Sequence, residues 1–232
     1  MGNTRNRLLD SLPPADLALL NRHLRLIPVE QGQMLEEPGR PTDRVYFPQT
    51  GMISLIVAMV EDCALEVGTV GKEGAIGLIT GIGSRISAVQ ALVQVSGTAW
   101  RIPAARFASA SARSPRIRTM IARYSDLLLA QVQQTAACNA LHDATSRVCR
   151  WLLQTSDTID SDRIPFTQEF LAEMLGVQRT TVSEVIRKLH TAGLVETRYR
   201  EIHIVDRAKL RQQACECYDI IRKHMNRMVV RP

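Results

Sequence analysis

Several features common in other protein classes are scarce or missing in this chain. Aromatic residues make up only 4% of its 232 residues, which argues against binding of single-stranded nucleic acid on aromatic stacking platforms. No apolar run approaches the roughly 20 residues of a membrane-spanning helix, and the N-terminus lacks the hydrophobic region of a signal peptide. We therefore expect a soluble, cytoplasmic protein without a membrane partner.

Cysteines are few and irregularly placed. The chain has five: Cys63, Cys138, Cys149, Cys215 and Cys217. Their odd number and spacing fit reduced thiols rather than a disulfide framework. If residues 208–225 form one helix, Cys215 and Cys217 point about 200° apart, so their sulfur atoms would not share an ion. We therefore predict no metal site, with Cys217 in the core and Cys215 more exposed. A thiol- or metal-responsive role for Cys215, Cys217 or Cys138 remains the alternative.

The residue patterns of common enzymes are also missing. The sequence has no Ser/His/Asp order and no convincing carboxylate pair. Residues 68–83 are rich in glycine but lack the Lys-Ser/Thr of a phosphate-binding loop. The five histidines are scattered, so none can be assigned as a haem ligand. We predict that the protein is not an enzyme and carries no cofactor.

The strongest pattern lies in residues 167–189. Apolar residues recur at helical spacing in residues 170–175 and again in residues 182–189. Between them, Gly176 can adopt a positive φ and so end the first helix. This stretch resembles the DNA-binding helix-turn-helix, whose second helix lies in the major groove. The alternatives are an ordinary helical hairpin with a solvated charged face, or a motif that serves only protein contacts.

The outer side of the second predicted helix carries Arg179, Ser183 and Arg187 one turn apart, with Thr180 and Lys188 beside them. Arg179, near the helix start, is placed to bond guanine O6 and N7. Thr180 and Ser183 can bond a base edge or a phosphate, whereas Arg187 and Lys188 are better placed for phosphate.

A β-hairpin is predicted directly after this helix, with a turn at residues 198–200. The basic excess is local, because residues 163–232 hold 13 Lys/Arg and 8 Asp/Glu, against 16 and 15 in the rest. Counterion release at DNA phosphates requires such a distribution. A membrane-surface role is the competing reading, but no basic amphipathic helix has a bulky aromatic face. The predicted DNA-binding residues are Thr167, Gln168, Gln178, Arg179, Thr180, Ser183, Arg187, Lys188, Arg198 and Arg200.

The first half of the chain has a different pattern. After a short helix that follows Pro13-Pro14, short strands broken by Gly, Pro and Asp fill residues 26–102 and predict an antiparallel sandwich or barrel. A helix of about 22 residues, or ~33 Å, is expected from 115 to 137. Its apolar stripe is too long to be buried wholly within a small domain, which predicts pairing with a second copy. The alternative is a connector packed on its own domain.

This order of elements resembles the Crp/Fnr family of bacterial transcription regulators over about residues 11–206, most specifically in the helix-turn-helix and in Gly-Ala-Ile-Gly-Leu at 74–78. Asp143 and Arg147 match the junction that follows the family's central helix. The resemblance implies an α+β fold. Its parts would be an N-terminal antiparallel β-roll of cyclic-nucleotide-binding type (1–114), a long central dimerisation helix (115–138) and a C-terminal winged helix-turn-helix (139–232).

The resemblance also implies partners. The family forms homodimers, here through residues 115–138, and binds double-stranded DNA at pseudo-palindromic operators with half-sites about 34 Å apart. An effector in the β-roll and a contact with RNA polymerase are further implications. In the recognition helix, Arg179 matches a base-reading arginine, but Thr180 and Glu184 replace family residues. We therefore expect a different half-site from that of the founding members.

The resemblance is weaker in the effector pocket. Ala75 replaces the Glu that holds a cyclic nucleotide's ribose, and Ile86 replaces the Arg that holds its phosphate, with Arg85 one residue off. A buried phosphate without that Arg would be uncompensated, which disfavours cyclic AMP. The aligned pocket residues are Gly74, Ala75, Ile76, Gly77, Leu78, Arg85, Ser87, Ala88, Val132 and Gln133. The N-terminal cysteine cluster of the family's iron–sulfur members is missing, since the first cysteine is Cys63.

Overall fold

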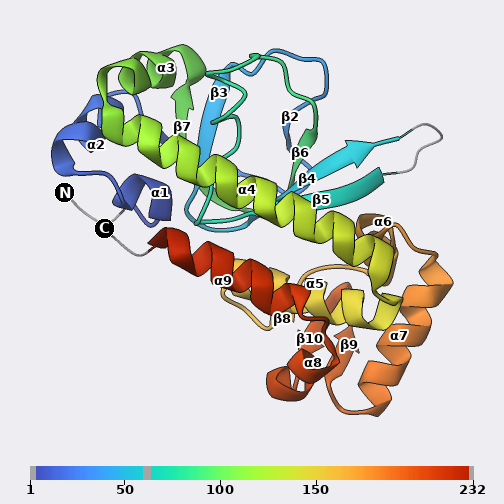
Figure 1. Ribbon diagram of the computed structural model, residues 1–232. Coiled ribbons are helices and arrows are strands. Elements are labelled where there is room, and N and C mark those ends of the chain that lie inside the picture. Colours follow the sequence, from blue (N-terminus) through green and yellow to red (C-terminus); the bar gives the residue numbers. More distant parts are fainter. Residues whose placement is uncertain (1–3, 60–63, 230–232) are drawn as a thin grey trace. The chain divides into compact units, whose positions relative to one another are not determined.

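The computed structural model describes residues 4–59 and 64–229 (Figure 1). Its helices are α1 (Arg7–Asp10), α2 (Pro14–Asn21), α3 (Ala104–Arg113), α4 (Pro115–Leu141), α5 (Ala144–Ile159), α6 (Gln168–Leu175), α7 (Arg179–Thr191), α8 (Arg207–Gln213) and α9 (Cys217–Val229). Its strands are β1 (Arg25–Val29), β2 (Met34–Glu36), β3 (Arg44–Pro48), β4 (Met52–Ala58), β5 (Ala64–Val70), β6 (Gln90–Val95), β7 (Gly97–Pro103), β8 (Arg163–Ile164), β9 (Val195–Arg198) and β10 (Glu201–Ile204). Cys63 lies outside the described residues.

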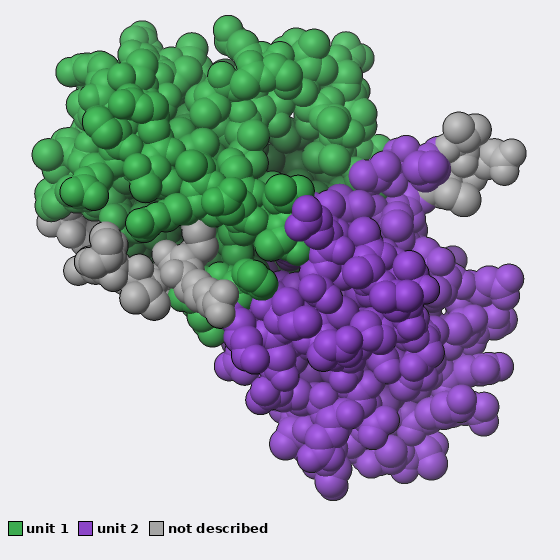
Figure 2. Space-filling model, in the orientation of Figure 1, with its two compact units in different colours: residues 1–56, 68–130, 224–232 green, residues 57–67, 131–223 purple. Residues whose placement is uncertain are grey.

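The chain divides into two compact units, which Figure 2 colours separately. The first unit comprises residues 1–56, 68–130 and 224–232, and the second comprises residues 57–67 and 131–223. Of the helices that the structure describes, none is long and apolar enough to cross a membrane.

Two antiparallel sheets, β1-β7-β3 and β2-β6-β4-β5, make the β-roll. Their alternating apolar residues point inward, and Val45, Phe47 and Ile102 are fully buried. Helices α2 and α3 pack onto this core through Leu20 and Phe107. The predicted α+β fold with an N-terminal antiparallel β-roll is therefore confirmed.

The long helix α4 ends at Leu141, four residues beyond its predicted end at residue 137. At its beginning, Ile117, Ile121 and Tyr124 are buried in the core of the β-roll. This part of the helix packs on its own domain, as the connector interpretation expected. Farther along, Leu129 and Ala136 are exposed. The chain itself therefore buries only the first part of the apolar stripe.

The second unit contains α5, α6, α7 and a small sheet of order β8-β10-β9. Trp151 on α5 is 2% exposed. Its ring lies 5.5 Å from that of Phe166 and 6.4 Å from that of Phe170 on α6. The indole N–H of Trp151 donates to Glu66 Oε1 at 2.8 Å. The ring contacts fix α6 against α5, and the hydrogen bond joins α5 to Glu66 on β5.

The C-terminal segment departs from its prediction as one continuous helix over 208–225. Ala214 has ψ 150°, so α8 stops before it, and a new helix begins at Cys217. The carbonyls of Cys215 and Glu216 accept the first hydrogen bonds of this new helix. Because of the break, both Cys215 and Cys217 are buried. Cys215 is still the more exposed of the two, at 8% against 0%, as expected, but the single helix on which that expectation was based is wrong.

Candidate nucleic-acid interface

Two helices and the turn between them form the predicted motif. The N-terminus of α6 is capped by Thr167, whose side-chain oxygen accepts the Phe170 N–H at 3.2 Å. The helix ends at Gly176, which has φ +61°, a left-handed conformation that glycine adopts without steric cost. Helix α7 then begins at Arg179. The prediction of two helices joined at Gly176 is confirmed.

Buried side chains hold these helices together. The apolar positions at helical spacing, Phe170 excepted, are all buried: Leu171, Met174, Leu175, Val182, Val185, Ile186 and Leu189. Ala172 is also buried, and its carbonyl accepts the N–H of Val177 at 3.0 Å, where the chain turns back. Packing therefore fixes which side of α7 faces outward.

The predicted junction pair supports the motif from α5. Asp143 caps α5 by accepting the Ser146 N–H at 3.0 Å, and this bond lowers the pKa of the Asp143 carboxyl. Four residues later, the buried Arg147 donates to the carbonyl of Leu175, the last residue of α6. Burial lowers the pKa of the Arg147 guanidinium. Its positive charge nevertheless complements the carbonyl end of the helix.

The outward side of α7 carries the predicted contact residues. Arg179, Thr180, Arg187 and Lys188 are exposed, and Ser183 is half-buried. Gln178, the exposed residue that precedes α7, is its N-cap position. In Figure 1, α7 lies along the edge of the second unit. The packing leaves a row of cationic and hydroxyl side chains uncovered.

Two polar contacts connect this face to the start of α6. The hydroxyl of Ser183 donates to Gln168 Oε1 at 2.8 Å, so these two predicted contact residues lie together. Arg179 lies 3.9 Å from Glu169, and both side chains are more than two-thirds exposed. Such an exposed ion pair contributes little to the stability of the fold, so the Arg179 guanidinium remains available to another partner.

The wing is present as predicted. Strands β9 and β10 pair so that Arg198 lies opposite Glu201, which leaves a two-residue turn of Tyr199 and Arg200. Tyr199 is 91% exposed, and Arg200 has φ +57°. Arg198 forms an exposed ion pair with Glu196 at 3.4 Å. The hairpin therefore presents two arginines at an open tip.

Comparisons with known proteins agree with this geometry. Residues 146–213 match the model of the Crp-like helix-turn-helix domain. The solved structure of a protein described as a transcriptional regulator of the crp/fnr family from Eubacterium rectale superposes with a TM-score of 0.73 at 17% identity, covering 91% of this chain and 99% of that chain. The chain has the Crp/Fnr fold.

Two further solved structures support the Crp/Fnr fold. FixK2 from Bradyrhizobium japonicum gives a TM-score of 0.71 at 14% identity, covering 83% of this chain and 98% of its own. The c-di-GMP responsive regulator CLP from Xanthomonas campestris gives 0.69 at 21% identity, covering 84% of this chain and 100% of its own. A search of curated protein sequences finds no significant match.

The segment that was predicted to line an effector pocket is tightly packed. Ala75, Ile76 and Leu78 are buried, and the backbone of Ile76 pairs with that of Tyr46. The buried hydroxyl of Tyr124 donates to the Ala75 carbonyl at 2.8 Å. A Cβ on Gly77, which has φ +73°, would lie 2.4 Å from the Arg44 carbonyl oxygen. A Cβ on Gly74 would lie 2.8 Å from the Tyr124 hydroxyl.

The other predicted pocket residues are dispersed. Arg85 and Ala88 are exposed, whereas Ser87 is buried. Val132 and Gln133 belong to the second unit, and Gln133 is exposed. The Arg85 cation therefore lies at the surface of the first unit and not in its interior.

Beside Ser87 lies a buried carboxylate that the sequence did not single out. Glu36 Oε1 accepts the Thr42 hydroxyl at 2.7 Å, and Glu36 Oε2 lies 3.3 Å from the Ser87 hydroxyl. Burial raises the pKa of Glu36, and these two hydroxyls partly oppose the rise. No spacing signal could have found it, because only the folded β-roll brings residue 36 to residue 87.

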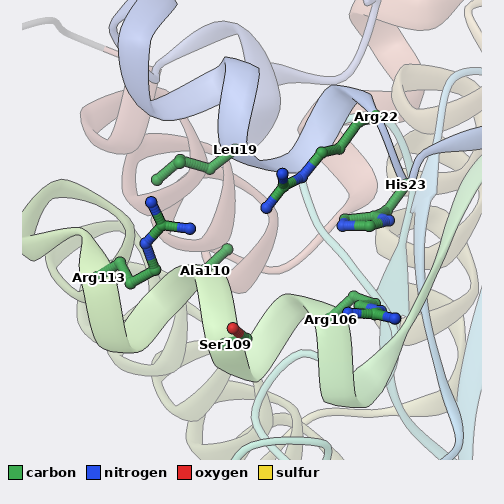
Figure 3. A pocket seen from close by; sticks show the side chains of 7 residues that line it. All are labelled: Leu19, Arg22, His23, Arg106, Ser109, Ala110 and Arg113. Atoms are coloured by element: carbon green, nitrogen blue, oxygen red, sulfur yellow. The ribbon is translucent and has the colours of Figure 1, made fainter.

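A separate hollow lies between α2 and α3 (Figure 3). It has an empty volume of about 250 Å³ that includes open solvent, and it is lined on opposite sides by Arg22 and Arg106. His23 is also part of the lining, and its pKa is lowered by partial desolvation and by the neighbouring arginines. This hollow contains none of the predicted effector residues.

Glu184 was noted in the sequence only as a departure from the family pattern. The structure places it in the open on α7, next to Ser183. An exposed carboxylate on a recognition helix can accept a hydrogen bond from the cytosine amino group. The position of Glu184 next to Ser183 was the signal that could have added Glu184 to the predicted DNA contacts.

Proposed function

We propose that this protein is a transcription regulator that binds double-stranded DNA through α7 and the wing. The observation that carries the proposal is the row of exposed cationic and hydroxyl side chains on α7. The opposite side of α7 is packed within the helix-turn-helix, which fixes this row facing outward. Arg179 near the start of α7 reads a base edge, while Arg187 and Lys188 bond phosphates. Thr180 and Ser183 add hydroxyl contacts, and Thr167, Gln168 and Gln178 flank them.

The proposed regulator is a homodimer joined through residues 115–138. The uncovered side of α4 supports this pairing, because six of its exposed residues recur at alternating steps of four and three: Ala122, Asp126, Leu129, Gln133, Ala136 and Ala140. That spacing is the heptad of a coiled-coil seam. Small side chains let two helices approach closely, and Leu129, 56% exposed, gains burial. The proposed division is 1–114 sensor, 115–138 dimerisation helix and 139–232 DNA-binding domain.

Further partners follow from this role. A bacterial regulator of this kind works in the cytoplasm, and we infer a contact with RNA polymerase by analogy with the Crp/Fnr family. The role is one of binding rather than catalysis. A protein-only function for the helix-turn-helix is the second candidate, and DNA titrations separate the two.

The proposal predicts salt-sensitive binding to duplex DNA. Each phosphate neutralised by Lys or Arg contributes about −0.9 to the slope of log K against log salt. Fluorescence anisotropy of the full chain on duplex fragments should therefore show affinity falling steeply between about 50 and 200 mM salt. Sedimentation of the complex should give two chains per duplex. Salt-independent binding, or none in dilute buffer, would leave the protein-only alternative.

The same DNA titration, carried out with variants of the two wing arginines, tests their role. Arg198→Ala and Arg200→Ala should each weaken binding to all sequences alike and reduce the salt slope by about 1. Arg163→Ala, on β8 in the same sheet but away from the wing tip, is the matched control. A change of base preference in either wing variant would contradict a phosphate-only role.

We further infer that cyclic AMP is not the effector. The exposed Arg85 and the buried Glu36 beside Ser87 support this inference, because a phosphate there would face a carboxylate instead of a guanidinium. Isothermal calorimetry should give a Kd for cyclic AMP weaker than about 1 mM. A micromolar Kd that Ser87→Ala abolished would show that the pocket still functions.

A further inference from the structure

Four potential metal ligands meet in the second unit. Cys138, His142, Cys215 and Cys217 each offer one ligand atom, and these atoms all lie within 4.8 Å of one another. Two come from the end of α4 and the residue after it, and two from the junction of α8 and α9. The three cysteines are buried and His142 is partly buried.

The break between α8 and α9 creates this convergence. In an unbroken helix the sulfur atoms of residues 215 and 217 would point to nearly opposite sides. In the structure Cys215 precedes α9 in non-helical backbone, so its side chain turns to the same side as that of Cys217. The prediction of no metal site assumed an unbroken helix, which the protein does not have.

The spacing of the ligand atoms fits a single tetrahedral ion. Sγ of Cys138 lies 3.5 Å from Sγ of Cys215, and Sγ of Cys217 lies 3.6 Å from Nδ1 of His142. Two thiolates bound to zinc at about 2.3 Å are about 3.8 Å apart, and a thiolate and an imidazole slightly less. A disulfide would require about 2.05 Å between the sulfurs, and the four cysteines that the structure describes are all free.

The surroundings complete the features expected of a metal centre. Nε2 of His142 lies 3.3 Å from the carboxylate of Glu216. An acceptor on the other ring nitrogen fixes the tautomer in which Nδ1 can bind a metal. The amide of Gln134 donates to Sγ of Cys217 at 3.0 Å. Hydrogen bonds of this kind stabilise a sulfur that carries negative charge.

Two buried arginines, Arg147 and Arg150, lie near Cys138. Arg150 is only 4% exposed, and its Nε has no hydrogen-bond partner. Among the described residues, neither Arg150 nor Arg147 forms a salt bridge; their hydrogen bonds go to Gln154 and to the Leu175 carbonyl. An unpaired buried charge is costly. Three thiolates around a divalent ion carry a net charge of −1, which would compensate one of these guanidinium groups.

We propose that Cys138, His142, Cys215 and Cys217 bind one Zn²⁺ ion in a closed Cys₃His site. On binding, the three thiols lose their protons to solvent, the neutral imidazole binds through Nδ1, and no electron is transferred. Closed four-ligand sites of this type are structural. The ion would cross-link the end of α4 to the segment that follows the wing. The zinc proposal does not rest on the proposed DNA binding, and the experiments that test it use no DNA.

Metal analysis of the full chain tests the proposal. Untagged protein purified under reducing conditions from zinc-supplemented cells, then dialysed against metal-free buffer, should hold about one zinc per chain. Cys138→Ser, Cys215→Ser and Cys217→Ser should each lose most of it. Cys149→Ala is the matched control, since Cys149 is a buried cysteine outside the cluster. The Co²⁺-substituted protein should show the strong visible bands and thiolate charge-transfer absorption of a tetrahedral site.

A milder pair of variants tests the site where the cysteine variants fail to fold. Glu216 is 69% exposed, so its replacement leaves the core intact. Glu216→Ala should lower zinc affinity about 10- to 100-fold, and Glu216→Gln, which keeps an acceptor, should restore part of it. Zinc content equal in all variants would overturn the proposal. Metal-free protein with a Cys138–Cys215 disulfide, or an iron–sulfur chromophore in anaerobically purified protein, would overturn it too.

Discussion

Replacing Arg179 with alanine is expected to weaken binding to the preferred operator by about 1–3 kcal/mol, roughly 5- to 150-fold. Arg179 is at the first position of α7, and its guanidinium is 69% exposed and held only by a long ion pair with Glu169. From that place it can bond guanine bidentately in the major groove. Base preference should therefore relax at one position per half-site. Titration against a panel of half-site variants measures both effects.

Lys188→Ala is the matched control for this prediction. Lys188 is another exposed cation, located about two and a half turns farther along α7. As a phosphate contact it should weaken binding to every sequence alike and reduce the salt slope by about 1. If Arg179→Ala behaved in the same uniform way, Arg179 would also be a phosphate contact, and its proposed base-reading role would be wrong.

Replacing Trp151 with alanine is expected to destabilise the second unit by about 3–5 kcal/mol. Trp151 is almost fully buried and packs against Phe166 and Phe170. Its removal leaves a cavity beneath α6, where the first helix of the motif is anchored. Urea unfolding followed by circular dichroism should show a lower midpoint, and DNA binding should be lost at temperatures where the wild type still binds.

Trp151→Phe separates packing from hydrogen bonding at this position. The variant keeps an aromatic ring beside Phe166 but removes the indole N–H that donates to the buried Glu66. We expect a smaller loss of about 1–3 kcal/mol, the usual cost of removing the partner of a buried polar group. Equal losses for both variants would mean that the hydrogen bond, not the packing, dominates.

The sequence alone determined the helix-turn-helix and the wing. Those elements depend on local patterns: apolar residues at helical spacing in residues 182–189, and a glycine at 176 where the backbone is left-handed. Each pattern acts within a few residues, so its physical consequence can be worked out without knowing the rest of the fold. The extended strands and the long helix followed from similar periodic signals.

Only the tertiary structure decided which distant side chains meet. The periodicity of residues 208–225 suits one helix, but the chain forms two helices there. Leu210 is buried before the break, and Tyr218 and Ile221 are buried after it. That break places two cysteines beside Cys138 and His142, about 75 residues away in sequence. The pairing of Glu36 with Ser87 is of the same kind, because long-range packing alone sets it.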